Sequence, residues 1–219
     1  MIRGVIFDMD GLMTDTERLF LRFWREVMTE RGEPEHREVV THCIGLNHSA
    51  TQEYVRRTLG MDFDYQGVMR EVARRSAAFC EECGVPVKPG LYILLDYLDA
   101  EHIPYAVATS TGYKNARWRL ENIGVMERLG GLVTGDMVTA GKPDPEIFEK
   151  AAAALELSAC QCMALEDSPH GVLAAHRAGC LPVMIPDLRE PDPETLRLLF
   201  GITDRLDHVI EILNRANHT

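Results

Sequence analysis

The feature that most constrains the fold is a regular alternation, after residue 86, between segments of helical periodicity and short apolar runs. Helices that alternate with strands imply a parallel sheet, because a parallel connection needs a crossover of helical length. Since such crossovers are right-handed, we predict an α/β fold, a doubly wound, Rossmann-like sandwich of three layers. The expected helices are Leu91–Glu101, Lys114–Asn122, Glu146–Leu157 and His170–Ala178, and the expected strands are Tyr105–Thr109, a short strand near Leu132 and Val133, Cys162–Leu165 and Leu181–Ile185.

The first strand is separated from this alternating region by a block that has helical periodicity alone. Residues 2–8 form a short apolar run that predicts a buried strand. A long helix is expected from about Asp15 to Arg31, and three further helices are expected before residue 84. The predicted domains are a core of residues 1–14 and 87–219 and an inserted all-helical domain of residues 15–86.

The opening strand leads directly into two carboxylates and a glycine. Because side chains two residues apart on a strand point the same way, Asp8 and Asp10 aim at one point just past the strand end. Converging carboxylates suit a hard divalent cation, and they can divide nucleophilic and acid–base work between them. Gly11 lets the backbone turn sharply and brings its amide close to a bound anion, so we predict that it contributes to substrate binding.

Further polar residues stand at the ends of later strands or just before a helix. Thr109 and Ser110 end one predicted strand, Lys142 precedes a predicted helix, and Glu166 and Asp167 follow another strand. Ligands bind doubly wound sheets at the carboxyl ends of the strands. We therefore expect these side chains to meet at the same edge as the two opening carboxylates.

Three of the helices near this edge have recognisable starting residues. Thr111 is expected to cap the helix that follows it, and Ser168 is expected to cap the helix that begins at Pro169. Asp144 is expected to be the N-cap of another helix, with Pro145 at its first position. Such helix starts also favour anions, because the N-terminus of a helix carries partial positive charge.

Together these motifs resemble the four motifs of the haloacid dehalogenase superfamily, in order and over essentially the whole chain. The resemblance implies that Asp8 attacks phosphorus and forms an aspartyl-phosphate. It implies that Asp10 protonates the leaving oxygen and then takes a proton from water. The Thr109 hydroxyl and the Ser110 amide would bind the transferring phosphoryl group, and Lys142 would pair with Asp8 and the phosphoryl oxygens.

The resemblance also implies a Mg²⁺ cofactor, which agrees with a site that offers oxygen ligands alone. The direct ligands would be Asp8, the backbone carbonyl of Asp10 and Asp167. Glu166 would either belong to the metal site or orient its waters or the lysine. Dehalogenases of this superfamily lack the second aspartate of the first motif and need no metal, so Asp10 favours phosphoryl chemistry.

Within the superfamily the chain is most similar to the β-phosphoglucomutase-like branch, in which the helical insert is a cap over the site. In this cap we predict Asn47 and Arg75 as substrate contacts. Two departures weaken the cationic grip on a second phosphate that a mutase needs: Phe20 replaces a His, and Gly112 lies where the mutase has a Lys. We therefore predict a phosphatase of small phosphorylated metabolites, with sugar phosphates foremost. The alternatives are a phosphomutase and a non-catalytic binding protein on the same fold.

The composition of the chain indicates which kinds of molecule it can bind. A formal net charge of −11 argues against nucleic acid and against an anionic membrane surface, whereas a phosphate substrate needs only local cations. No signal peptide is evident, and no stretch approaches the ~18 apolar residues of a transmembrane helix, so we expect a cytoplasmic protein, and a monomer. The 6 cysteines are expected to be reduced thiols, because Cys80 and Cys83 form a lone C-x-x-C pair without the second pair typical of zinc sites.

Overall fold

The computed structural model describes residues 1–43 and 48–217, and in these ranges the strands form one parallel sheet. The 6 strands lie in the order β3-β2-β1-β4-β5-β6, and each neighbouring pair is parallel. The first strand, β1, lies in the middle of the sheet. β2 and β3 follow on one side of it, and β4, β5 and β6 follow on the other side. This is the doubly wound arrangement that the sequence predicts. The strands are β1 (Gly4–Phe7), β2 (Tyr105–Thr109), β3 (Gly131–Thr134), β4 (Cys162–Glu166), β5 (Leu181–Met184) and β6 (Gly201–Ile202).

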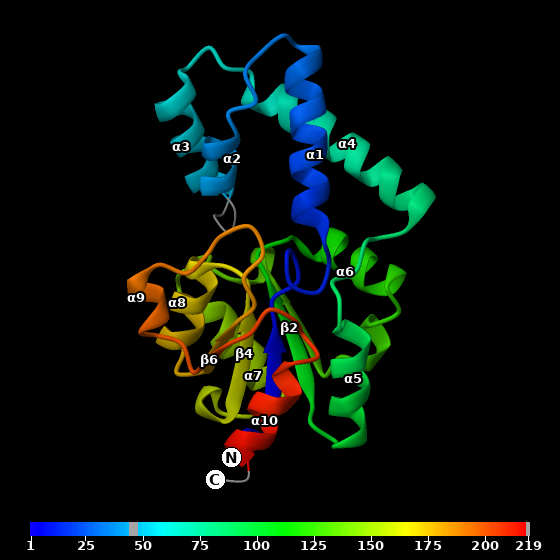
Figure 1. Ribbon diagram of the computed structural model, residues 1–219, viewed down its shortest axis with the longest axis vertical. Helices are drawn as coiled ribbons and strands as arrows, with labels where there is room; N and C mark the ends of the chain where they lie inside the picture. The colour runs from blue at the N-terminus through cyan, green and yellow to red at the C-terminus, as the bar shows by residue number, and fades with distance from the viewer. Residues whose placement is uncertain (44–47, 218–219) are drawn as a thin grey trace.

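The two faces of the sheet pack against different helices, because side chains alternate along each strand. On β1, Val5 and Phe7 belong to a larger core cluster that includes α5, α6 and α10, whereas Ile6 belongs to a smaller cluster with α7 and α8. Figure 1 shows the resulting helix–sheet–helix layers. The helices of this part are α5 (Leu91–Ala100), α6 (Tyr113–Asn122), α7 (Glu146–Ala154), α8 (Pro169–Arg177), α9 (Pro193–Leu196) and α10 (Val209–Asn217).

Four helices between β1 and α5 lie together beyond the carboxyl ends of the strands (Figure 1). α1 and α4 pack along each other, and the rings of Phe23 and Phe79 meet edge to face with centroids 6.1 Å apart. The described residues of this block contain no strand, in agreement with the helical periodicity of the sequence, and no helix in the described chain is long and apolar enough to cross a membrane. The helices are α1 (Thr16–Glu30), α2 (Arg37–Cys43), α3 (His48–Leu59) and α4 (Tyr65–Cys83).

The two segments that join these helices to the sheet run side by side. The Asp15 N–H donates to the Pro86 carbonyl at 2.9 Å, and the Lys88 N–H donates to the Met13 carbonyl at 3.0 Å. The two boundaries of the predicted helical domain are therefore tied to each other. The division into a core of residues 1–14 and 87–219 and a cap of residues 15–86 stays a prediction.

The structure differs from the sequence-based expectation mainly at element ends and near the C-terminus. α7 ends at Ala154 instead of Leu157, because Glu156 adopts a left-handed conformation with φ 57°. The sequence pattern did not reveal β6, α9 or α10. Near the end of α10, the Asn217 side chain accepts a hydrogen bond from the Ile2 N–H at 2.7 Å, so the last helix holds the start of the chain.

Candidate active site

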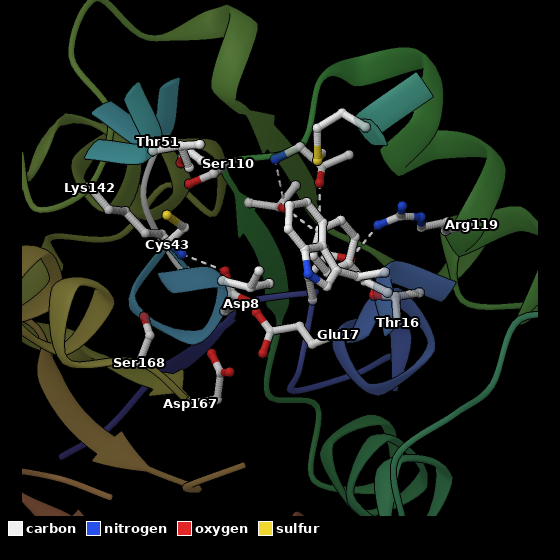
Figure 2. Close-up of a pocket in the computed structure, with 18 of the residues that line it drawn as sticks. Asp8, Thr16, Glu17, Cys43, Thr51, Ser110, Arg119, Lys142, Asp167 and Ser168 are labelled. Carbon is white, nitrogen blue, oxygen red and sulfur yellow. Dashed lines mark hydrogen bonds and ion pairs between the residues drawn. The ribbon is translucent and has the colours of Figure 1, made fainter. Parts of the chain in front are cut away.

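The polar motifs meet at the carboxyl ends of the strands, beneath the four helices of the inserted block. They line a cavity of about 350 Å³ whose opposite wall comes from α1, α2, α3 and α4. Figure 2 shows this cavity, with Lys142 and Arg119 approaching from opposite sides of Asp8. Of the predicted site residues, those that line the cavity are Asp8, Asp10, Thr109, Ser110, Lys142 and Asp167.

Lys142 is a buried cation shared between two carboxylates. Its Nζ donates to Asp8, to Glu166 at 2.6 Å and to the Ala108 carbonyl at 3.0 Å, so all three N–H bonds are used. Burial disfavours the charge on Lys142, but Asp8 and Glu166 outweigh it and raise the pKa of this lysine above its usual value. Burial raises the pKa of Asp8 to about 7 in spite of Lys142, since one ammonium faces more than one carboxylate. The carboxyl groups around Asp8 therefore outnumber the one fixed cation that contacts it.

The Asp10 carboxylate is fixed by side chains from three different parts of the chain. Thr16 at the start of α1 donates to Oδ1 at 2.6 Å, and Thr111 donates to Oδ2 at 2.7 Å. The guanidinium of Arg119 on α6 forms an ion pair with Oδ1. The sequence identified Asp10 but none of these partners. Arg119 stands on a predicted helix with no motif around it, so no sequence signal marked it.

Thr111 does not cap α6 as expected. The residue before α6 is Gly112, and the N–H of Tyr113 donates to the Asp136 carboxylate at 3.1 Å instead. The Thr111 hydroxyl is turned to Asp10. The expectation was wrong because a carboxylate from the loop after β3 is close enough to take the capping position.

The buried carboxyl groups of Asp167 and Glu17 lie close to Asp8. Figure 2 shows the three side chains turned toward one another. Burial, followed by repulsion from Asp10 and Asp8, raises the pKa of Glu17 well above its usual value. Burial, followed by repulsion from Glu17, does the same to the pKa of Asp167. The Glu17 Oε2 atom is buried without a hydrogen-bond partner among the described residues. The sequence analysis assigned no role to Glu17, which lies six positions after Gly11.

Gly11 makes this crowding possible. Its φ is 86°, a left-handed conformation that favours glycine. A Cβ at this position would collide with Asp167 Oδ2 and would lie 3.0 Å from Glu17 Oε2. Gly11 thus leaves room for the carboxylates, and the predicted role of its amide in substrate binding stays a prediction.

The donor set fits Mg²⁺. Asp8 and Asp167 offer carboxylate oxygens, and the backbone of Asp10 offers a carbonyl. In the described chain, no three His, Cys, Asp or Glu side chains are grouped to hold a metal by themselves. Mg²⁺ does not need such a group, because it is usually held by one or two carboxylates and keeps several waters. The buried, mutually repelling carboxylates are an environment that a divalent cation neutralises.

Glu166 is also predicted as a metal ligand, but in the structure both of its carboxylate oxygens accept hydrogen bonds from protein side chains. Its Oε1 accepts from Lys142, and its Oε2 accepts from the Ser168 hydroxyl at 3.1 Å. Gly171 gives it space, because a Cβ there would collide with the Glu166 carboxylate. Ser168 also caps α8 as predicted, accepting from the Gly171 N–H at 3.1 Å. Glu166 therefore anchors Lys142 and the start of α8, and Asp167 is the member of the acidic pair that lines the cavity.

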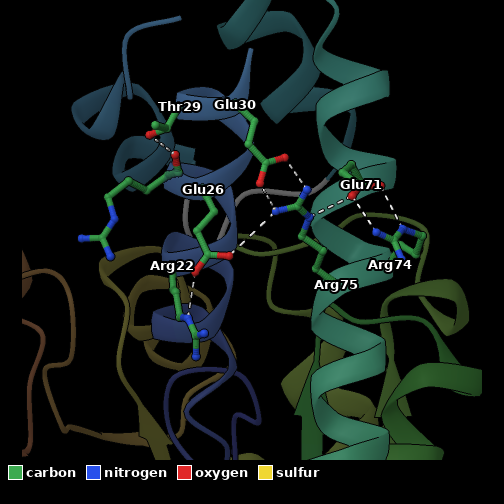
Figure 3. A network of polar contacts seen from close by, with 8 residues as sticks. Arg22, Glu26, Thr29, Glu30, Glu71, Arg74 and Arg75 are labelled. Atoms are coloured by element: carbon green, nitrogen blue, oxygen red, sulfur yellow. Dashed lines mark hydrogen bonds and ion pairs between the residues drawn. The ribbon is translucent and has the colours of Figure 1, made fainter. Parts of the chain in front are cut away.

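The two predicted substrate contacts in the helical block have different outcomes. Asn47 lies outside the described residues. Arg75 does not line the cavity: it faces α1, where it donates to Glu30 at 2.8 Å through Nη1 and to Glu71 at 2.8 Å through Nε, and it lies 3.8 Å from Glu26 (Figure 3). Its guanidinium is already engaged within the helical block, so the structure places it away from any substrate in this cavity.

Comparison with known proteins agrees with this geometry. The family model described as haloacid dehalogenase-like hydrolase matches residues 5–185. The chain is 32% identical over 180 residues to validoxylamine A 7'-phosphate phosphatase of Streptomyces hygroscopicus subsp. limoneus, covering 82% of this chain and 83% of that protein. It is 29% identical over 178 residues to the phosphorylated carbohydrates phosphatase of Thermotoga maritima. That match covers 81% of this chain and 82% of the Thermotoga protein.

The fold also has solved counterparts. A crystal structure of β-phosphoglucomutase from Clostridium difficile superposes with a TM-score of 0.79, covering 100% of this chain and 98% of that chain at 21% sequence identity. This likeness concerns the fold, whereas the family assignment rests on the match over residues 5–185 and on the sequence relatives. On these grounds the chain belongs to the haloacid dehalogenase-like hydrolase family.

Proposed function

We propose that this hydrolase is a Mg²⁺-dependent phosphatase that acts on small phosphorylated metabolites through an aspartyl-phosphate on Asp8. The observation that carries the proposal is the placement of Asp8 between the buried ammonium of Lys142 and the carboxylate of Asp167, with Asp10 on the same cavity wall. A nucleophile, a fixed cation, a metal ligand and an acid–base group thus surround one point. Family membership supports the same chemistry.

The reaction proceeds in two steps. In the first, an Asp8 oxygen bonds to phosphorus while the bond from phosphorus to the leaving oxygen breaks, and Asp10 gives that oxygen a proton. In the second, water bonds to phosphorus, Asp10 takes a proton from the water, and the bond between Asp8 and phosphorus breaks. Transfer of this kind depends on positioning and on charge stabilisation, and Lys142 supplies one fixed positive charge.

The remaining residues hold the phosphoryl group and the cofactor. The Thr109 hydroxyl and the Ser110 amide, at the end of β2, would bind phosphoryl oxygens. Asp8, Asp167 and the Asp10 carbonyl would hold Mg²⁺, which when bound supplies the charge neutralisation that lets one anion approach another. Residues 15–86 would form a cap that excludes water from the site and contributes to substrate choice.

Arg119 favours hydrolysis over the mutase alternative. A mutase must grip a second phosphate with cations. Among the described residues that line the cavity, Arg119 is the cation other than Lys142, and its guanidinium is paired with Asp10.

The named relatives suggest the substrate range. One is a phosphatase of phosphorylated carbohydrates and another acts on validoxylamine A 7'-phosphate. By analogy, we include sugar phosphates among the substrates of this chain.

The test is phosphate release from p-nitrophenyl phosphate and a panel of sugar phosphates, with Mg²⁺, after exhaustive chelation, and after Mg²⁺ is restored. We expect release that depends on Mg²⁺ and is absent in Asp8→Asn, a variant that preserves shape and should keep the melting temperature. Full activity after chelation, or in Asp8→Asn, would contradict the proposal. Conversion of β-glucose 1-phosphate to glucose 6-phosphate with little free phosphate would identify a mutase, and no turnover of any ester would favour a binding protein.

A further inference from the structure

The cavity has a polar floor and an apolar roof. The floor is the carboxylate cluster at the strand ends, whereas the roof comes from the later part of α1 and from α2, α3 and α4. Phe20 and Met69 of the roof are half-buried, so a ligand can reach them, and the other roof side chains form a layer at most 6% exposed behind them. The apolar roof residues are Phe20, Trp24, Val40, Val55, Tyr65 and Met69.

The described part of the roof offers few hydrogen-bonding groups to a ligand. Thr51 of α3 brings a hydroxyl and Tyr65 brings a phenol. The indole N–H of Trp24 is already donated to the Glu35 carbonyl at 2.6 Å. A hydroxyl group that leaves water for such a surface loses hydrogen bonds that the surface does not replace. An apolar group that covers the same surface gains stability in proportion to the area removed from water.

We propose that the phosphomonoester this enzyme hydrolyses best carries an apolar or aromatic group, held against Phe20 and Met69 while its phosphate lies beside Asp8. The inference rests on the proposed phosphatase function and narrows its substrate class. Phe20 and Met69 are then specificity-determining residues. Phe20, which stands where the mutase has a His, places an apolar ring on this wall of the cavity.

A second cavity lies beside Phe20 and Met69. Phe20 and Met69 line a second cavity, of about 820 Å³, formed by α1, α4 and α6. This second cavity adjoins the first, because both are lined by Thr16, Phe20, Met69 and Arg119.

The test compares two esters of the same shape. Cyclohexylmethyl phosphate and glucose 6-phosphate are both primary alkyl monoesters with a six-membered ring, and they differ in the ring oxygen and hydroxyl groups. Because polar mismatches in an apolar pocket change kcat/KM by about 10–10²-fold, we expect kcat/KM to be at least about tenfold higher for the cyclohexylmethyl ester. A higher kcat/KM for glucose 6-phosphate would overturn the inference.

A matched pair of variants locates the preference. Met69→Gln keeps the length of the side chain but places an amide on the roof, so the ratio of the two kcat/KM values should fall by at least about threefold. Met61→Gln is the control, since Met61 is 76% exposed and lies outside both cavities, and it should keep the wild-type ratio. A ratio that Met69→Gln leaves unchanged would also overturn the inference.

The outcomes separate this inference from the proposed function. Phosphate release that favours glucose 6-phosphate refutes the apolar substrate class but leaves the phosphatase proposal intact. If neither ester nor p-nitrophenyl phosphate releases phosphate with Mg²⁺ present, the proposed function fails, and the inference fails with it.

Discussion

Arg119 and Asp10 form an ion pair across the candidate active site, although 109 positions separate them in the chain. The guanidinium donates to the same carboxylate oxygen that accepts from Thr16, so α6 and the start of α1 hold Asp10 from two sides. The side chains of the pair are 27% and 23% exposed, which leaves the pair accessible from the cavity. An acid–base residue fixed in this way has little freedom to take up unproductive positions.

We predict that Arg119→Gln lowers kcat by about tenfold with a smaller change in KM. Thr16 and Thr111 still hold Asp10 in this variant, so the loss is smaller than the ~10²–10⁴-fold typical of removing a general acid–base group. Steady-state kinetics on p-nitrophenyl phosphate measures the effect. The control is Arg117→Gln on the same helix, where the arginine pairs with Glu121 at the surface. Equal kcat values for the two variants would show that the ion pair does not position Asp10.

A second prediction concerns the buried charge at the centre of the site. Lys142→Met should destabilise the fold by about 3–5 kcal/mol, because it leaves the buried carboxylates of Asp8 and Glu166 without their cation. The double variant Lys142→Met/Glu166→Gln should recover part of that loss, since one uncompensated charge is removed. Urea unfolding measures both.

The matched control for this experiment is Lys150→Met. Lys150 pairs with Glu146 on the exposed side of α7, and its side chain is 46% exposed, so its loss should cost no more than about 1 kcal/mol. If Lys142→Met were as stable as Lys150→Met, the shared ammonium would not be a structural requirement of the site.

Metal binding should release protons near neutral pH. The pKa of Asp8 is raised to about 7, and those of Asp167 and Glu17 are also raised, chiefly by burial. With a pKa of about 7, the Asp8 carboxyl group is partly protonated near neutrality, whereas Mg²⁺ binds its ionised form. Mg²⁺ affinity should therefore increase from about pH 6 to about pH 8, with net proton release.

Calorimetry in two buffers of different ionisation enthalpy gives the number of protons released. The Asp8→Asn variant serves as the control and should release fewer. A Mg²⁺ affinity that is flat or falls over this pH range would contradict the prediction.

The sequence predicted those parts of the molecule that follow from local patterns. The alternation of helical and apolar segments gave the parallel sheet, and the strand ends gave the positions of Asp8, Thr109 and Asp167. These features depend on periodicity and on the rule that ligands bind where parallel strands end. β6, with 2 residues, is too short to show any periodicity.

The parts that the sequence did not predict depend on how separate elements dock. Arg119 reaches Asp10 only because α6 turns that face to the first loop, and Glu17 enters the carboxylate cluster only because α1 starts beside it. Arg75 is the opposite case. Its sequence context leaves it free to bind a substrate, but in the folded protein it pairs with acidic side chains, one of them on another helix. Here α1 supplies Glu30, which is 45 positions away along the chain.

The last prediction follows from that arrangement and concerns Arg75. We expect Arg75→Met to lower the melting temperature by a few degrees and to leave the relative kcat/KM values of different substrates unchanged, because the guanidinium joins α1 to α4 and does not line the cavity. Arg74→Met is the control, since the ion pair of Arg74 is to Glu71 on its own helix. A change in substrate preference in Arg75→Met alone would restore Arg75 as a specificity residue.

The pH dependence of the same variant gives an independent check. Hydrogen bonds from Arg74 and Arg75 lower the pKa of Glu71 to about 2, and a hydrogen bond from Arg75 lowers that of Glu30. An acid whose pKa is lower in the folded state stabilises the fold above its unfolded pKa, about 4.3 for Glu, and this stabilisation is lost as the pH falls through the folded value. The difference in melting temperature between the wild type and Arg75→Met should therefore be greatest near pH 7 and shrink between about pH 4.5 and pH 2. A difference that stays constant over this range would mean that Arg75 stabilises the helices through packing of its aliphatic part instead of through its charge.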